Sequence, residues 1–244
     1  MAQYLTEAII LAVRNWGEAD KMVTLLSRDH GKIIAIAYGC RRPKNRLAGA
    51  IQVFSQVELS LMSGHGIETI KQCELKQSFR KIREDLQAMA YAAFANELVV
   101  EFCPDRQPEP YVYDLLVQVL TTITCRNPRL VALAAAWQLL ALVGYQAQYD
   151  HCVICGQPLS QDAFFDSEKG GGVCKACKQQ DLPEMSERAR RFLDQLLYLD
   201  WEQPPSFTVS GAVLLQSEKI LTGYITCLLG KPLKSLEFIK QVSV

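Results

Sequence analysis

The chain has 244 residues, of which 49% are hydrophobic, and its 26 basic and 26 acidic residues leave no net formal charge. This length suffices for one large domain or two small ones, and the composition excludes a chain too polar to bury a core. Glu7 but no lysine or arginine precedes the first apolar run, so no secretory signal peptide is expected. We interpret the charge-free stretch 130–149 as a buried core helix and not as a membrane span, and expect a cytoplasmic protein.

The charges are unevenly distributed along the chain. Residues 1–83 contain thirteen Lys and Arg against seven Asp and Glu, a balance of +6, whereas residues 84–244 contain thirteen against nineteen, a balance of −6. A basic first part indicates a polyanionic partner, and an acidic remainder would limit indiscriminate adhesion. The alternative is an uneven but inert solvated surface.

The first 80 residues predict five short β-strands. These strands are expected at 7–15, 21–28, 32–38, 53–61 and 66–75. The fourth shows the clearest period of two, because Val57 and Leu59 fall on one face and Glu58 falls on the other. Five short strands joined by tight turns at 29–31 and 63–66 are typical of a small closed barrel, and the OB-fold is the five-stranded barrel that often binds nucleic acid.

The loop between the third and fourth expected strands is strongly basic and is stiffened by Pro43. Cations on this loop and on nearby strands would hold a phosphate backbone with strong salt dependence and little base preference. The seven candidate DNA-binding residues are Lys21, Arg28, Lys32, Arg41, Arg42, Lys44 and Arg46. The aromatic residues available for base stacking are Tyr4, Trp16, Tyr38 and Phe54. An ordinary solvated loop is the alternative interpretation.

From residue 80 onwards the hydrophobic period changes to about 3.6 residues, which favours helices. Helices are expected at 84–102, 111–125, 129–143, 186–199, 212–229 and 235–242, with a loop at 201–207. The predicted fold class is therefore α+β. An OB-fold barrel would occupy residues 1–80 and a helical domain residues 81–244, with an inserted four-cysteine zinc finger at 150–180.

The zinc prediction rests on two C-x₂-C pairs. Cys152 and Cys155 form the first pair, Cys174 and Cys177 form the second, and 18 residues separate them, which is the spacing of a zinc site. Four thiolates complete the closed tetrahedral shell of one structural Zn²⁺ and leave no position for a water molecule. Two disulfides or four unrelated thiols are the alternatives. The neighbouring His151 is interpreted as a surface residue that could replace a ligand.

The sequence lacks the usual catalytic constellations. It has three histidines and no G-x-S-x-G elbow, Walker loop or dinucleotide fingerprint. A closed four-cysteine site would also lack the open position that a zinc hydrolase needs. We therefore expect neither an enzyme nor a small-molecule substrate. A zinc-ribbon and OB-fold scaffold that binds proteins without contacting DNA is the alternative function.

The sequence resembles a known protein family. Residues 31–59, GKIIAIAYGCRRPKNRLAGAIQVFSQVEL, followed by helices and the cysteine insert, look like the bacterial RecO family of recombination mediator and DNA repair proteins. Residues 7–27 resemble the opening strands of that family, and residues 224–236 are similar to its closing helices. The resemblance covers nearly the whole chain.

The resemblance implies an N-terminal OB-fold, a helical C-terminal domain and a zinc finger that some members lack. It implies binding of single- and double-stranded DNA, annealing of strands coated with single-strand-binding protein, and loading of RecA through a complex with RecR, near the bacterial nucleoid. It also suggests that the helical domain binds the acidic tail of single-strand-binding protein. The candidate cations for that tail are Arg126, Arg129, Arg188, Arg190 and Arg191.

Overall fold

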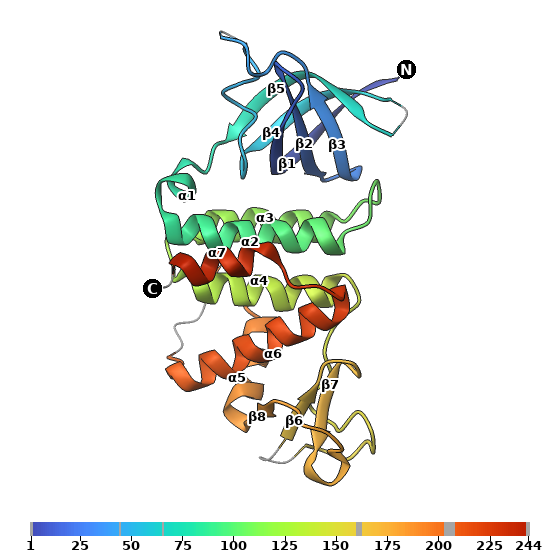
Figure 1. Ribbon diagram of the computed structural model, residues 1–244, viewed down its shortest axis with the longest axis vertical. Coiled ribbons are helices and arrows are strands. Elements are labelled where there is room, and N and C mark those ends of the chain that lie inside the picture. Colours follow the sequence, from blue (N-terminus) through green and yellow to red (C-terminus); the bar gives the residue numbers. More distant parts are fainter. Residues whose placement is uncertain (1, 44, 65, 160–162, 203–207, 243–244) are drawn as a thin grey trace. The chain divides into compact units, whose positions relative to one another are not determined.

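The computed structural model describes residues 2–43, 45–64, 66–159, 163–202 and 208–242 (Figure 1). The chain forms two compact units, which are described separately below. Unit 1 comprises residues 1–128 with 238–244, and unit 2 comprises residues 129–237. The first helices thus group with the barrel by contact, and the domain boundary predicted near residue 80 stays a prediction.

Unit 1 begins with a closed five-stranded barrel. Its strands are β1 (Gln3–Trp16), β2 (Asp20–Ser27), β3 (Gly31–Ala37), β4 (Gln56–Met62) and β5 (Glu68–Gln77). They follow the order β1-β2-β3-β5-β4, and β4 pairs back with β1 to close the barrel. Neighbouring strands are antiparallel except β3 and β5, which make a short parallel pair. The predicted α+β class with an OB-like barrel is confirmed.

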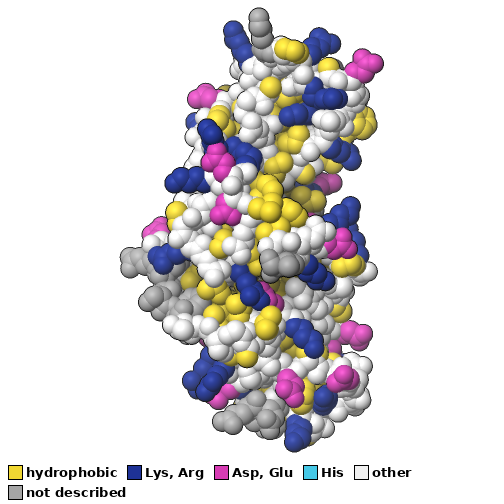
Figure 2. Space-filling model, turned by 60° about the vertical axis from the view of Figure 1, so that its left-hand side comes forward, with side chains coloured by type: hydrophobic (Ala, Val, Ile, Leu, Met, Phe, Trp, Pro, Cys, Tyr) yellow, Lys and Arg dark blue, Asp and Glu magenta, His cyan; other side chains and the backbone are white. Residues whose placement is uncertain are grey.

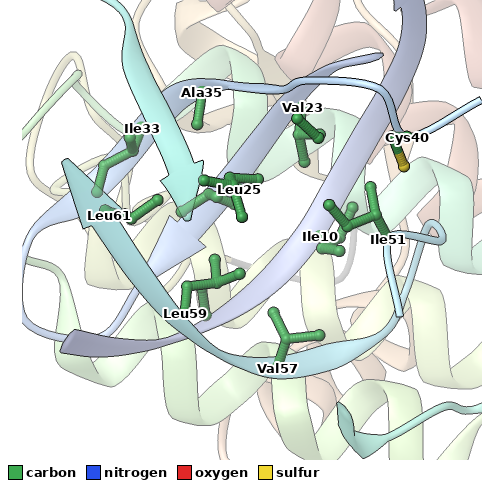
Figure 3. Close-up of a cluster of buried hydrophobic side chains, with 13 residues drawn as sticks. Ile10, Val23, Leu25, Ile33, Ala35, Cys40, Ile51, Val57, Leu59 and Leu61 are labelled. Carbon is green, nitrogen blue, oxygen red and sulfur yellow. The ribbon is translucent and has the colours of Figure 1, made fainter. Parts of the chain in front are cut away.

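The barrel interior is filled by aliphatic side chains from all five strands (Figure 3). The predicted alternation in β4 is confirmed, because Val57, Leu59 and Leu61 are fully buried in this cluster. Cys40 and Ile51 also belong to the cluster and come from the long segment between β3 and β4. The basic loop is therefore part of a segment whose apolar residues are anchored inside the barrel.

A β-bulge in β1 connects the barrel to the first long helix. The β1–β2 register shifts between Ile10 and Ala12, which leaves Leu11 as the extra residue. The carbonyl oxygen of Leu11 accepts a hydrogen bond of 2.9 Å from Nδ2 of Asn96, a buried residue of α2 (Leu86–Phe102). A helix side chain thus satisfies the backbone group that the bulge leaves outside the ladder.

Three helices complete the described N-terminal part of unit 1. They are α1 (Arg80–Glu84), α2 and α3 (Pro110–Thr122). The carboxylate of Asp85 caps α2 by accepting bonds of 2.9 and 3.0 Å from the N–H groups of Gln87 and Ala88. Pro110 occupies the first turn of α3, where its missing N–H costs no helix bond. These local signals explain why the helix starts were predicted within a few residues.

The loop between α2 and α3 is locked onto the barrel by a buried carboxylate. Glu68 is fully buried and receives an ion pair of 2.8 Å from Arg106 on this loop. Its other oxygen accepts the hydroxyl of Tyr4, and burial together with this bond raises the pKa of Tyr4. Gly31, with φ of 70°, lies so close to the loop that an added Cβ would meet the Gln107 carbonyl oxygen at 2.0 Å. Only glycine fits this approach.

Unit 2 contains helices and a small sheet. After α4 (Pro128–Leu142), the segment forms the strands β6 (Ala163–Asp166), β7 (Gly171–Cys174) and β8 (Glu184–Met185), with a 3₁₀ turn at Lys175–Cys177. The strand order is β7-β6-β8, and all pairs are antiparallel. The helices α5 (Glu187–Leu197) and α6 (Gly211–Leu229) follow, and α7 (Lys234–Val242) begins in unit 2 and ends among the residues of unit 1. The sequence predicted the helices but not this sheet.

Tyr224 of α6 packs the small sheet onto the helices of unit 2. Its ring meets the fully buried Phe165 of β6 edge-on, with centroids 5.5 Å apart, and stacks at 6.4 Å on Trp137 of α4. Its hydroxyl donates to the Tyr145 carbonyl oxygen at 3.2 Å. One aromatic side chain therefore joins α4, α6 and the sheet.

Two apolar helices of unit 2 bear on the membrane question. Helix α4, which covers most of the charge-free stretch, is largely buried, so its interpretation as a core helix is confirmed. Among the described residues, α6 is long and apolar enough to cross a membrane by length and composition, with a mean hydropathy of 1.2 and 33% of that window buried. The core helix of a globular protein passes the same test.

Candidate nucleic-acid interface and metal centre

The basic loop is fastened to the hairpin that joins β1 and β2. The backbone N–H of Gly39 donates to Oδ1 of Asp20 at 2.7 Å, and the N–H of Arg41 donates to the Ala19 carbonyl oxygen at 2.8 Å. The Arg41 guanidinium reaches the same hairpin, with a bond of 3.0 Å to the Glu18 carbonyl oxygen. Three hydrogen bonds therefore position the start of the loop before any ligand binds.

Asn45 holds the loop in its turn. Its Nδ2 donates to the Gly39 carbonyl oxygen at 2.8 Å, while its Oδ1 accepts the N–H of Leu47 at 2.8 Å. The N–H of Arg42 donates to the same Gly39 oxygen at 2.9 Å. Side-chain amides commonly stabilise turns in this way. Lys44, one of the predicted DNA-binding residues, lies outside the described residues.

Three predicted loop cations project into solvent. Arg41, Arg42 and Arg46 are exposed, and among the described residues none of them forms an ion pair with a carboxylate. Lys21 lies near the same end of the barrel, because it is the outermost residue of β2 that pairs with β3, opposite Ala37. Figure 2 shows dark blue Lys and Arg side chains on the barrel surface with few magenta carboxylates among them. In the described part of the chain this end of the barrel therefore presents three arginines without ion-pair partners, although Glu18 and Asp20 lie in the adjoining hairpin.

Arg28 and Lys32 lie at the other end of the same strands. The ladder runs from Ser27 opposite Gly31 to Lys21 opposite Ala37, which is about 20 Å at 3.3 Å per residue. Arg28 forms an ion pair of 3.0 Å with Asp114, and the largely buried Lys32 donates to the Val100 carbonyl oxygen at 2.6 Å. The structure therefore does not bring all seven predicted cations together.

The four clustered cysteines converge at one point of unit 2. Their Sγ atoms all lie within 4.8 Å of one another, and those of Cys155 and Cys174 are 3.8 Å apart. Four sulfurs at 2.3 Å around a tetrahedral Zn²⁺ would be separated by about 3.8 Å. All four cysteines are free thiols, so the disulfide alternative is not the arrangement found. The cluster can hold a metal ion, and the described candidate set does not include His151.

Glycines let the two cysteine pairs approach each other. A Cβ on Gly171 would lie 2.3 Å from the Gln148 carbonyl oxygen and 2.4 Å from a methyl carbon of Val153. A Cβ on Gly172 would lie 2.3 Å from a methyl carbon of Leu159. At both positions the missing side chain allows close contact between the segments that carry the two pairs. The N–H of Val153 uses this proximity to donate to the Gly172 carbonyl oxygen at 2.9 Å.

The thiols of the cluster are not equivalent. Burial raises the pKa of Cys152, but hydrogen bonds from backbone N–H groups, that of Cys174 first, outweigh burial and lower this pKa to about 6. Hydrogen bonds with the thiols of Cys174 and Cys155 raise the pKa of Cys177 to about 12. Thiolate is the form that binds metals, so these backbone hydrogen bonds favour the metal-binding form of Cys152, and a bound cation would replace the protons of the other thiols.

The five arginines considered for an acidic tail differ in their surroundings. Arg129 forms an ion pair with Glu218, Arg191 pairs with Glu187 at 2.6 Å, and Arg190 donates to the Leu159 carbonyl oxygen at 3.2 Å. Arg126 and Arg188 are exposed. Binding of such a tail stays a hypothesis with no committed residue.

Comparison with known proteins identifies the family to which this chain is similar. The family model for the recombination protein O N terminal matches residues 1–79, and that for the recombination protein O C terminal matches residues 83–237. The chain belongs to the RecO family. A protein of Symbiobacterium thermophilum named DNA repair protein RecO is 36% identical over 246 residues, covering 98% of this chain and 97% of the relative. A relative of the same name from Pelotomaculum thermopropionicum is 32% identical over 243 residues, covering 99% and 95%.

The resemblance to RecO drawn from the sequence is thereby confirmed over the full chain. Sequence reasoning missed the residues that support the candidate RecO interface, Asp20 and Asn45. The turn preference of asparagine was a usable signal for Asn45. Asp20 gave no local signal, because its partner Gly39 is 19 residues away and is reached only through the β2–β3 pairing.

Proposed function

We propose that this RecO-family chain is a mediator of DNA repair and recombination that acts without catalysis. In this proposal Arg41, Arg42 and Arg46, with Lys21 beside them, hold the phosphate backbone of single- and double-stranded DNA. Phosphate contacts carry no sequence information, so base pairing between the two strands would provide the selectivity of annealing. The protein need only lower the repulsion between the strands.

The observation that carries this proposal is the group of exposed arginines on a loop that is hydrogen-bonded in place. Arg41 and Arg42 lack acidic partners among the described residues, so binding phosphate breaks no existing ion pair. The loop is already ordered by Asp20 and Asn45, which reduces the entropy lost on binding. Arg28 and Lys32 are engaged with Asp114 and Asp105, and we give them a secondary role.

The proposal is tested by replacing Arg41 and Arg42 with alanine and titrating single-stranded DNA at several salt concentrations. Affinity at moderate salt is expected to fall about tenfold or more, because two charge-assisted hydrogen bonds are lost. The slope of log affinity against log salt should fall by roughly 1.4 for two lost phosphate contacts.

Arg80→Ala with Lys81→Ala is the matched control. It removes two adjacent exposed cations of unit 1 from α1 and leaves the loop intact. An equal loss in both double variants would mean that only overall charge matters. Failure of the unchanged chain to bind any DNA would favour the protein scaffold.

For the cysteine cluster we propose one structural Zn²⁺ held by Cys152, Cys155, Cys174 and Cys177. Four sulfur ligands are the preferred set of a structural zinc site, which fits the short separations of these thiols. The ion would supply fixed geometry and no reaction. Metal analysis of purified protein should give about one zinc per chain, as this set implies.

The partner proteins follow from family membership alone. We propose that the chain anneals strands coated with single-strand-binding protein, whose C-terminal tail it contacts, and that it helps load RecA together with RecR in the bacterial cytoplasm at the nucleoid. Full-length similarity to proteins named for DNA repair supports this proposal. A strand-annealing assay with and without single-strand-binding protein tests it, and no acceleration in either case would contradict it.

A further inference from the structure

Two large aromatic rings are exposed beside the basic loop. Of the four aromatic residues considered for stacking, Phe54 is buried and Tyr4 is engaged with Glu68 and with the ring of His30. Trp16 and Tyr38 remain, with 45% and 56% of their surface exposed. Other exposed rings, such as Tyr111 and Tyr198, occur elsewhere in the chain, so it is the position of Trp16 and Tyr38 beside the basic loop that singles them out.

The strand pairing puts both rings in one row across the barrel. Trp16 pairs with Asp20 in the β1–β2 ladder, and Tyr38 follows Ala37, whose partner Lys21 is the neighbour of Asp20. Asp20 therefore stands between the two aromatic positions. At an interstrand spacing of about 4.8 Å, they are roughly 10 Å apart.

Side-chain alternation places the same row on the outer face. Val13, Val23 and Ala35 pack in the barrel interior. Trp16, Asp20 and Tyr38 each lie three positions from one of these interior residues. Because side chains alternate between the two faces of a strand, an odd separation places all three on the outer face. The register of β1, β2 and β3 therefore predicts that all three side chains point away from the barrel interior.

The row adjoins the candidate phosphate contacts. The hairpin that follows Trp16 accepts the hydrogen bonds of Arg41, and Gly39, next to Tyr38, binds the Asp20 carboxylate. The aromatic positions are thus fixed by the same bonds that hold the basic loop. An aromatic pair beside cations that form no ion pair within the described residues has the chemistry of a single-stranded nucleic-acid site, in which rings stack on bases and cations follow the backbone.

We propose that Trp16 and Tyr38 form a stacking platform for unpaired bases. This inference rests on the proposed function and deepens it, since it assigns the discrimination between single-stranded and duplex DNA to two named rings. Duplex bases are already stacked and cannot reach these rings, so the arginines serve both forms and the platform serves only unpaired bases. Because every base has a π-face, the platform is tolerant of sequence.

The test compares three probes of equal length: an oligothymidylate, an abasic oligonucleotide and a duplex. Trp16→Ala and Tyr38→Ala should each weaken binding of oligothymidylate by roughly fivefold or more. Binding of the abasic strand and of the duplex should change by less than about twofold, because neither presents unpaired bases. In the Trp16→Ala and Tyr38→Ala variants the slope of log affinity against log salt should equal that of the unchanged protein, whereas in the arginine variants this slope should fall.

Two further measurements distinguish a loss of base stacking from misfolding of the alanine variants. Oligothymidylate should quench the fluorescence of Trp16 in the unchanged protein, and the abasic strand should not. The same titration of Trp16→Phe measures the background signal of the other two tryptophans, Trp137 and Trp201. The ring-retaining pair Trp16→Phe with Tyr38→Phe should keep most of the affinity. Tyr111→Ala is the matched control, because Tyr111 is 74% exposed and begins α3, after the loop that docks at the Gly31 end of β3.

The outcomes separate the two proposals. If the unchanged protein binds all three probes but the alanine variants keep full affinity for oligothymidylate, the platform is overturned and the phosphate contacts stand. Equal losses on all three probes, or quenching by the abasic strand, would also overturn the platform. If the unchanged protein binds no probe, the proposed function fails together with the platform.

Discussion

The barrel and the cysteine module are stabilised in different ways. The barrel buries a continuous aliphatic cluster to which all five strands and the segment between β3 and β4 contribute. The sheet of unit 2 has two strands of four residues and one of two, too few to enclose a core of their own. This sheet buries only short apolar stretches, including Phe165, Val173 and Met185, and the proposed metal would add to their contribution, whereas the barrel is held by its aliphatic cluster.

This contrast predicts that metal removal is the most damaging change. Cys152→Ser removes one of the four sulfur ligands of the proposed zinc ion and should unfold the β6–β8 sheet. Zinc binding contributes on the order of 10 kcal/mol to folding in small zinc domains. Hydrogen exchange of residues 150–180 should rise sharply, while exchange in the barrel strands stays slow. Cys227→Ser, which changes an exposed cysteine of α6, is the control. A variant that retains a protected sheet would show that the metal is dispensable.

The next largest effect is expected inside the barrel. Leu59→Ala removes a fully buried side chain and should lower the free energy of unfolding by about 2–5 kcal/mol, through lost burial and the cavity left behind. Leu5→Ala, at a position 67% exposed in β1, should change it by less than about 0.5 kcal/mol. Urea unfolding followed by circular dichroism measures both. Chelation of metal should leave this difference unchanged, and a dependence on metal would contradict the separation of the two mechanisms.

A smaller effect is expected at the polar contact of unit 1. Tyr4→Phe removes the hydroxyl that donates to the buried Glu68 and leaves its pair with Arg106 at 2.8 Å. The loss of one donor to a buried carboxylate should cost about 1–3 kcal/mol. The urea midpoint should fall with an unchanged m-value. Tyr111→Phe, at an exposed ring, serves as the control, and an equal shift in both variants would show that Glu68 does not depend on Tyr4.

Local periodicity was sufficient to predict the five strands and the main helices. Val57 and Leu59 alternate with polar neighbours, and Asp85 and Ser186 cap the helices that follow them, so the signals lie within a few residues. The start of β1 was placed late, because the first residues of the strand invert the usual pattern: Leu5 is exposed and Thr6 is buried. The strands β6 and β7 were missed because each has only four residues, two of them glycines in β7, which is too few to show a period.

The candidate sites depend on contacts that local sequence does not contain. The four cysteines were predicted because their spacing alone encodes the shared ligand geometry. The different situations of Lys32 and Arg41 could not be predicted. Lys32 is paired by Asp105, 73 positions later, whereas the Arg41 guanidinium, within the described residues, donates to backbone oxygens of the hairpin. Whether a cation is available for a ligand is a property of the fold and not of its neighbours in the chain.

The bulge at Leu11 has a consequence for dissecting the protein. A fragment that stops at the end of β5 would lack Asn96, and the carbonyl oxygen of Leu11 would lose its donor. It would also lack Arg106, so the carboxylate of Glu68 would be left without a cation inside the barrel. Recombinant fragments of this end of the chain should therefore extend through α3 to Pro128, and they would still lack residues 238–244, which also group with unit 1.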